Sequence, residues 1–119
     1  MSAAATPERP SARIADEILS WEGITTKPGR FGSTEYYYGT RGVGHGHRDR
    51  LADLPFPTKL RNELVAARRA EPHHFLPDTG WVTVRLNAPE DVDRVLDLFR
   101  LNYDLIRSKK QSARAAPGA

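Results

Sequence analysis

The chain has no cysteine and no long hydrophobic run. The lack of cysteine excludes disulfide bonds, a thiol nucleophile and a cysteine-ligated zinc site. No apolar stretch approaches the roughly 18 residues that a membrane-spanning helix needs. The N-terminal stretch MSAAATPERPS also lacks the hydrophobic core of a secretory signal peptide. We therefore expect a cytoplasmic protein without a membrane partner, built as one domain.

Several common catalytic signatures are missing as well. There is no GxSxG nucleophile elbow, no HExxH zinc motif, no Walker lysine-serine pair and no GxGxxG spacing. A serine hydrolase of the elbow type and a phosphate-cradling loop are therefore not supported. The sequence gives no sign of an organic cofactor, and we predict none.

Positive charge is concentrated at the C-terminal end. The formal net charge is +3, and the last residues contain four basic side chains and no acidic one: Arg107, Lys109, Lys110 and Arg114. Residues 11–106 are therefore close to neutral. Such a basic end, rich in small residues, is typical of a disordered segment, with nucleic-acid contact as the alternative. We expect disordered tails at 1–10 and 107–119 around a folded domain at 11–106.

The spacing of apolar residues predicts an α+β fold. Helical periodicity indicates one helix that begins at residue 11 and is capped by Gly23, a second over 59–70 and a third from 89 to about 106. Strand propensity and turn signals predict strands, and 73–76 is a short strand or an extended loop. The predicted strands are 24–27, 33–38, 41–47 and 81–86. This order favours an antiparallel sheet packed by three helices on one face.

Two segments carry more detailed predictions. Residues 51–57, LADLPFP, contain two prolines and are predicted to be an ordered loop rather than a central strand. In 81–86, WVTVRL, strict alternation places Trp81, Thr83 and Arg85 on one face and the two valines and Leu86 on the other.

Residues 42–47, GVGHGH, alternate glycine with valine or histidine. A two- or four-residue loop to the preceding strand would place Tyr36 and Tyr38 on the face of His45 and His47. Glu35, Tyr37 and the glycines would then occupy the opposite face, whereas a three-residue loop would reverse the assignment. A row of glycines allows a helix, a ligand or an aromatic ring to approach the backbone closely.

The histidine face admits three interpretations. In the first interpretation, His45 and His47 are metal ligands, and Asp49 with His73 or His74 completes the set of ligands. Alternatively, the imidazoles act on a small molecule as acid–base or hydrogen-bonding groups, with Tyr36 and Tyr38 as a stacking wall. In the third interpretation they are ordinary half-exposed residues, satisfied by water or by Asp49.

Two further groups border this face. Because adjacent residues in an extended chain point in opposite directions, at most one of His73 and His74 is expected to face a site shared with His45 and His47. Trp81 is expected chiefly as a core anchor, with ligand contact as the alternative.

A resemblance to a known family rests on three segments: GHGHRDRLADLPFP, LRNELVAARRAEPHHFLPDTGWVTVRL and PEDVDRVLDLFRLNYD. Together they resemble the small luciferase-domain proteins common in actinobacteria, over about residues 23–104. These proteins are distantly similar to the fungal luciferases, which oxidise a hydroxylated α-pyrone with molecular oxygen. The matching positions here are His45, His47, His74, Trp81 and Tyr103. The part from His74 to Ile106 also resembles YjbR-like double-wing proteins, which implies a compact CyaY-like α+β fold and a link to DNA binding.

The resemblance implies a small-molecule-binding protein, and it suggests a cofactor-independent oxygenase acting on a planar phenol, enol or pyrone. The catalytic candidates are His45, His47 and His74, and the ligand-binding candidates are Tyr36, Tyr38, Asp49 and Trp81. The alternatives are a non-catalytic module that contacts nucleic acid or a protein, and a histidine-ligated metalloprotein. The sequence does not decide the oligomeric state.

Overall fold

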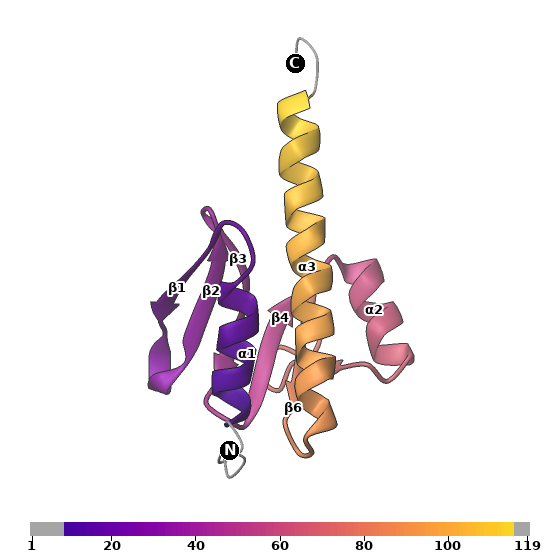
Figure 1. The fold of residues 1–119 in the computed structure, drawn as a ribbon. Coiled ribbons are helices and arrows are strands. Elements are labelled where there is room, and N and C mark those ends of the chain that lie inside the picture. Colours follow the sequence, from indigo (N-terminus) through magenta and orange to yellow (C-terminus); the bar gives the residue numbers. More distant parts are fainter. Residues whose placement is uncertain (1–8, 116–119) are drawn as a thin grey trace.

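The sheet and helices expected from the sequence are present. The computed structural model describes residues 9–115, which form a six-stranded antiparallel sheet in the order β1-β2-β3-β4-β6-β5 and three α-helices (Figure 1). The helices are α1 (Pro10–Leu19), α2 (Thr58–Ala66) and α3 (Glu90–Ala115). The strands are β1 (Ile24–Pro28), β2 (Thr34–Tyr38), β3 (Arg41–His47), β4 (Leu51–Pro55), β5 (Glu71–Pro72) and β6 (Trp81–Arg85), and a 3-10 turn η1 (Arg30–Gly32) precedes β2. The predicted α+β class is confirmed.

One face of the sheet packs against α1 and α3, which cross it side by side (Figure 1). Tyr36 from β2 packs edge-on against Phe99 of α3, with ring centroids 5.4 Å apart, and Tyr38 packs likewise against Tyr103 at 5.5 Å. The alternation in β6 has the predicted sense, because Val82 and Val84 join this core. The opposite face is thereby left for polar residues.

The predicted loop at 51–57 is wrong in its first part. Residues 51–55 form β4, a central strand paired with both β3 and β6. Pro55 is tolerated because it is the last residue of the strand, and Pro57 lies just outside it, before α2. The prolines therefore end the strand and do not exclude it.

The face assignment for the β2–β3 hairpin is also wrong. The loop has two residues, as Tyr38 pairs with Arg41, but the register shifts between Tyr36 and Tyr37, so that Tyr36 lies opposite Gly44. The extra residue of this bulge exchanges the faces of the residues that follow it. Tyr36 and Tyr38 therefore face the helices, and the two histidines of β3 face the other side.

The third helix is longer than predicted. It continues past Ile106 to Ala115, through most of the segment expected to be a tail, in a sequence of good helix formers. Two basic side chains of this part lie over aromatic rings, Arg107 over Tyr103 and Lys110 over Tyr38. Nucleic-acid binding by this segment stays a prediction. Most of the tail predicted at 1–10 lies outside the described residues. Within them, no helix combines the length and the apolar character needed to cross a bilayer.

Two glycines of β3 give a matched test of the packing. A Cβ at Gly44 would lie 2.9 Å from Cε1 of Phe99 and 3.0 Å from the carbonyl oxygen of Asp53, whereas one at Gly46 would meet no atom within 4 Å. We expect Gly44→Ala to lower the free energy of unfolding by about 1–3 kcal/mol. Gly46→Ala should leave it unchanged or raise it slightly, and urea denaturation of both variants measures the difference. Equal effects would contradict this packing.

Candidate functional site

A row of paired residues crosses all six strands on the face opposite α1 and α3. In order across the sheet it contains Lys27, Glu35, His45, Asp53, Thr83 and Glu71. Its centre is Asp53, in the middle of β4, with His45 on one side and Thr83 on the other. His47 lies on the same face, two residues along β3 from His45. The sheet thus brings imidazole and carboxylate groups together.

Four histidines converge on one oxygen of Asp53. The Nε2 atoms lie 3.3 Å (His45), 3.2 Å (His47), 3.4 Å (His73) and 3.2 Å (His74) from Oδ2. The Asp53 side chain is only 1 % exposed, whereas three of the imidazoles are about a quarter exposed. The carboxylate therefore forms the floor of the cluster, and the rings rise around it toward solvent.

Asp53 is ionised despite its burial. Burial by itself raises the pKa of the carboxyl, but contacts with His45, the Thr83 hydroxyl and His74 outweigh it and hold the pKa well below its usual range. Thr83 donates a hydrogen bond to the other carboxylate oxygen, Oδ1, over 2.6 Å. One oxygen is thus fixed by the sheet, and the other is directed at the histidines.

His73 and His74 both reach the site, which the sequence analysis did not expect. The chain leaves the extended conformation after β5, and the two rings stack with centroids 4.5 Å apart. The backbone N–H groups of Phe75 and Leu76 donate to Nδ1 of His73 over 3.0 and 3.1 Å. The rule that neighbours point apart fails here because this turn folds around the His73 ring.

The four imidazoles do not have equal roles. Since Nδ1 of His73 accepts two N–H bonds, it carries no proton, and the neutral ring bears its proton on Nε2, facing Asp53. Burial also lowers the pKa of His73, against the opposing attraction of Asp53, which favours this neutral form. Burial and the neighbouring His45 lower the pKa of His47. Nε2 of His73 therefore carries its proton on the side of Asp53 and offers no lone pair there. Among the described residues, no backbone N–H group donates to Nδ1 of the other three rings.

The cluster opens into a cavity of about 320 Å³. Arg30 and Phe31 of η1 border it on one side and Phe75 on another. Phe31 is 88 % exposed and Phe75 is 79 % exposed, although both are large and apolar. Phe31 also has a left-handed backbone with φ of 57°, which is strained for a residue with a side chain.

The structure brings together some of the predicted site residues and separates others. His45, His47 and His74 share the site, and the ring of Trp81 lies beside them, 5.3 Å from the ring of His45. Asp49 does not join them: it accepts a hydrogen bond from the backbone N–H of Ser11 and lines a different cavity. Tyr36 and Tyr38 lie in the helix-covered core, so their expected place beside the histidines is wrong.

The sequence analysis missed Asp53, and it held that His73 and His74 could not both take part. The signal for Asp53 was present: with 48–50 as the turn and 51–55 as a strand, Asp53 falls directly opposite His45. The two prolines of LADLPFP led to the prediction of a loop, so that strand was not recognised. No pattern in the sequence predicted that the chain would turn around His73.

Comparison with known proteins identifies the family. A family model described as the luciferase domain matches residues 40–102, which is more than half of the chain and includes Asp53 and all four histidines. No curated protein matches the chain. No solved structure matches it either. The expected actinobacterial and YjbR-like relationships stay predictions. The chain belongs to the luciferase-domain family.

Proposed function

We propose that the protein binds one divalent transition-metal ion through His45, His47, His74 and Asp53. The ion would hold an ionised phenol or enol in the adjoining cavity, for oxidation by molecular oxygen. The convergence of imidazole nitrogens on Oδ2 of the buried Asp53 carries this proposal. The oxygenase reaction class is what the family resemblance implies, and the metal is an addition to it.

The spacing of the donor atoms fits coordination. Imidazole nitrogens and carboxylate oxygens bind such metals at about 2.0–2.2 Å, so two ligands of one ion lie roughly 3.0–3.5 Å apart. The three Nε2 atoms of His45, His47 and His74 lie 3.2–3.3 Å from Oδ2. The donor atoms of His45, His47 and Asp53 all lie within 4.8 Å of one another, whereas His74 groups with Asp53 and His73. One ion could therefore bind His45, His47 and Asp53 first, and the His74 ring would move toward it to complete the set.

Hydrogen bonding alone accounts for this arrangement less well. A charge-assisted N–H···O⁻ bond is about 2.7–2.9 Å long, and one carboxylate oxygen offers about two acceptor positions. Here four nitrogens surround one oxygen at longer distances, and only the His74 contact has the geometry of a hydrogen bond. Hydrogen bonding therefore accounts for one of the four contacts and leaves the other three without an explanation.

The donor set limits the metal and its ligand. Neutral imidazoles with one carboxylate and no thiolate suit iron, manganese, copper, nickel or zinc. Four protein ligands leave at least one position open in a five- or six-coordinate site. The ion and Asp53 together carry one net positive charge, which would favour an anionic oxygen such as that of an ionised enol.

The cavity walls suit a planar ligand. Phe31 and Phe75 offer two exposed aromatic faces, and the Phe75 ring lies 4.4 Å from the ring of His74. Covering exposed aromatic rings with a flat apolar group removes apolar surface from water and allows ring stacking, which favours binding of such a ligand. Arg30 adds a positive charge at the rim.

Replacing Phe31 by glycine should separate ligand binding from stability. Glycine adopts φ of 57° without strain, and Phe31 is almost fully exposed, so we expect the melting temperature to stay the same or rise. The affinity for a planar phenol should fall about three- to tenfold, from the loss of one aromatic contact. Isothermal titration and thermal denaturation of the same preparation measure both. Unchanged affinity would contradict the role of this ring.

His73 is expected to be a positioning residue and not a ligand. His73→Ala should weaken metal binding about 10- to 100-fold, because Asp53 loses the group that orients it. Glutamine can accept from the backbone with its oxygen and donate with its nitrogen, so His73→Gln should restore part of the affinity. His74→Gln should not be rescued in this way. Chelator competition distinguishes the two, and equal losses in both glutamine variants would contradict the assignment.

The proposed function is tested with 4-nitrocatechol as the probe. The metal-loaded protein should shift its absorbance on binding, and oxygen uptake should follow with a redox-active metal such as iron. The metal-free protein and His47→Ala should bind it at least about tenfold more weakly. 4-Nitroanisole, which has no ionisable hydroxyl, is the matched control. Equal binding of nitrocatechol with and without metal would overturn the proposal.

A further inference from the structure

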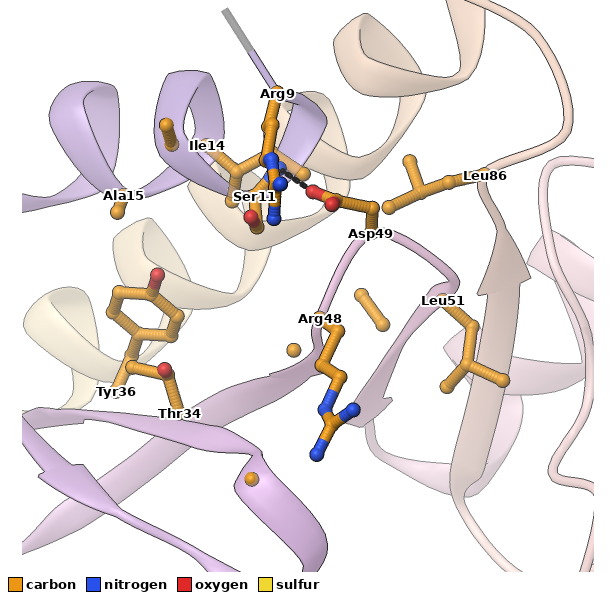
Figure 2. Close-up of a pocket in the computed structure, with 14 residues that line it drawn as sticks. Arg9, Ser11, Ile14, Ala15, Thr34, Tyr36, Arg48, Asp49, Leu51 and Leu86 are labelled. Atoms are coloured by element: carbon orange, nitrogen blue, oxygen red, sulfur yellow. Dashed lines mark hydrogen bonds between the residues drawn. The ribbon is translucent and has the colours of Figure 1, made fainter.

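A second cavity lies on the other side of the sheet. It has a volume of about 360 Å³, is partly open to solvent, and lies between the start of α1 and the neighbouring ends of β2, β3 and β4 (Figure 2). Ile14 and Ala15 of α1 and Leu51 of β4 supply apolar surface. The volume is in the range of small-molecule sites in proteins. It shares no lining residue with the cavity of the histidine cluster.

Tyr36 presents an unpaired hydroxyl to this cavity. The residue is 3 % exposed, and its hydroxyl has no hydrogen-bond partner among residues 9–110. Figure 2 shows the hydroxyl directed away from the sheet, toward α1. The ring is buried, but the hydroxyl oxygen is not among the fully buried unpaired atoms, so it can be reached from the cavity. Since the described residues supply no partner, the hydroxyl is available to a ligand.

The charges around the cavity favour an acid. Hydrogen bonds from Ser11, and to a smaller extent the nearby Arg9, hold the pKa of Asp49 below its usual range. The negative charge of Asp49 therefore offsets the positive charge of Arg9. Arg48 lines the same cavity and makes no salt bridge within the described part of the chain. One net positive charge therefore remains, on a group that binds carboxylates in a bidentate way.

The floor of the cavity is kept open by small residues. Gly46 lies between Thr34 and Ala52 in the sheet, and a Cβ there would meet no atom within 4 Å. It follows His45 and precedes His47, yet it faces the opposite side. The alternation of glycine and histidine in β3 thus places His45 and His47 in the cluster on one face of the sheet. On the other face, Gly46 leaves space for the second cavity.

We infer that this cavity is a second small-molecule site, which takes a compact ligand with an apolar body and one carboxylate. The carboxylate pairs with Arg48, the Tyr36 hydroxyl bonds to a ligand oxygen, and the apolar body lies against Ile14 and Leu51. This inference does not depend on a metal at the histidine cluster, because no residue is shared.

Benzoate and hexanoate are suitable probes, with the full-length protein and detection by isothermal titration and saturation-transfer NMR. Benzyl alcohol and benzylamine have similar bodies without the carboxylate and should bind at least about tenfold more weakly. Gly46→Val fills the floor and should weaken benzoate binding at least about tenfold, while metal uptake is retained. Gly42→Val, on the same strand but outside this cavity, is the matched control and should leave benzoate binding unchanged.

Tyr36→Phe removes only the hydroxyl, so it tests the site even if Gly46→Val does not fold. It should weaken benzoate binding about three- to tenfold with an unchanged circular dichroism spectrum. The inference is overturned if neither acid binds at about 10 mM. It is also overturned if Tyr36→Phe leaves binding unchanged, or if Gly42→Val abolishes it.

Discussion

Replacing Asp53 by asparagine should lower the affinity for a divalent metal ion by about a thousandfold or more. The change keeps the shape of the side chain and the acceptor for the Thr83 hydroxyl, which lies 2.6 Å from Oδ1. Among the residues that the structure describes, it removes the only carboxylate within salt-bridge distance of the four imidazoles. The loss should therefore arise from the missing charge and not from a change of fold.

Asp49→Asn is the matched control for this experiment. Asp49 lies four residues earlier in the chain, but its carboxylate accepts a hydrogen bond from the backbone N–H of Ser11 on the far side of the sheet. Competition with a chromophoric chelator measures both variants under the same conditions. Metal binding by Asp53→Asn at the affinity of the unmodified protein would contradict the proposed centre, as would an equal loss in Asp49→Asn.

The second large expected effect is that a bound metal ion stabilises the folded protein. The proposed ligands come from β3, β4 and the loop after β5, segments that meet only in the folded chain. A metal ion at a thousand times its dissociation constant should therefore stabilise the fold by about 4 kcal/mol. For a domain of this size, the melting temperature should rise by roughly 10–25 °C.

Scanning calorimetry with and without Mn²⁺, Fe²⁺ or Zn²⁺ measures this shift. His47→Ala should abolish most of it, because one of four ligands is lost. Mg²⁺ prefers oxygen ligands and should have little effect, which controls for ionic strength. A similar shift in His47→Ala, or with Mg²⁺, would show that the stabilisation arises elsewhere.

The sequence was informative where a local pattern is decisive. Alternation in WVTVRL gave the correct faces of β6, and helical periodicity located α3 from its start to about residue 106. These residues obey the periods of strand and helix, and neighbouring segments do not change them. His45 and His47 were recognised for the same reason, as a pair two residues apart on a strand.

The site itself could not be completed from sequence, because it depends on pairing between segments. The bulge beside Tyr36 exchanges the faces of the hairpin, and nothing local to GVGHGH reveals it. The role of Asp53 depends on its register opposite His45. The joint presence of His73 and His74 depends on a turn held by two N–H bonds to one imidazole. Each is a property of the assembled sheet.

The most direct measurement is elemental analysis of the untagged protein, expressed with iron, manganese, zinc and copper available, beside Asp53→Asn. The account predicts about one transition-metal ion per chain in the unmodified protein and little in the variant. A folded, unmodified protein that contains no metal and takes up none on titration would contradict it.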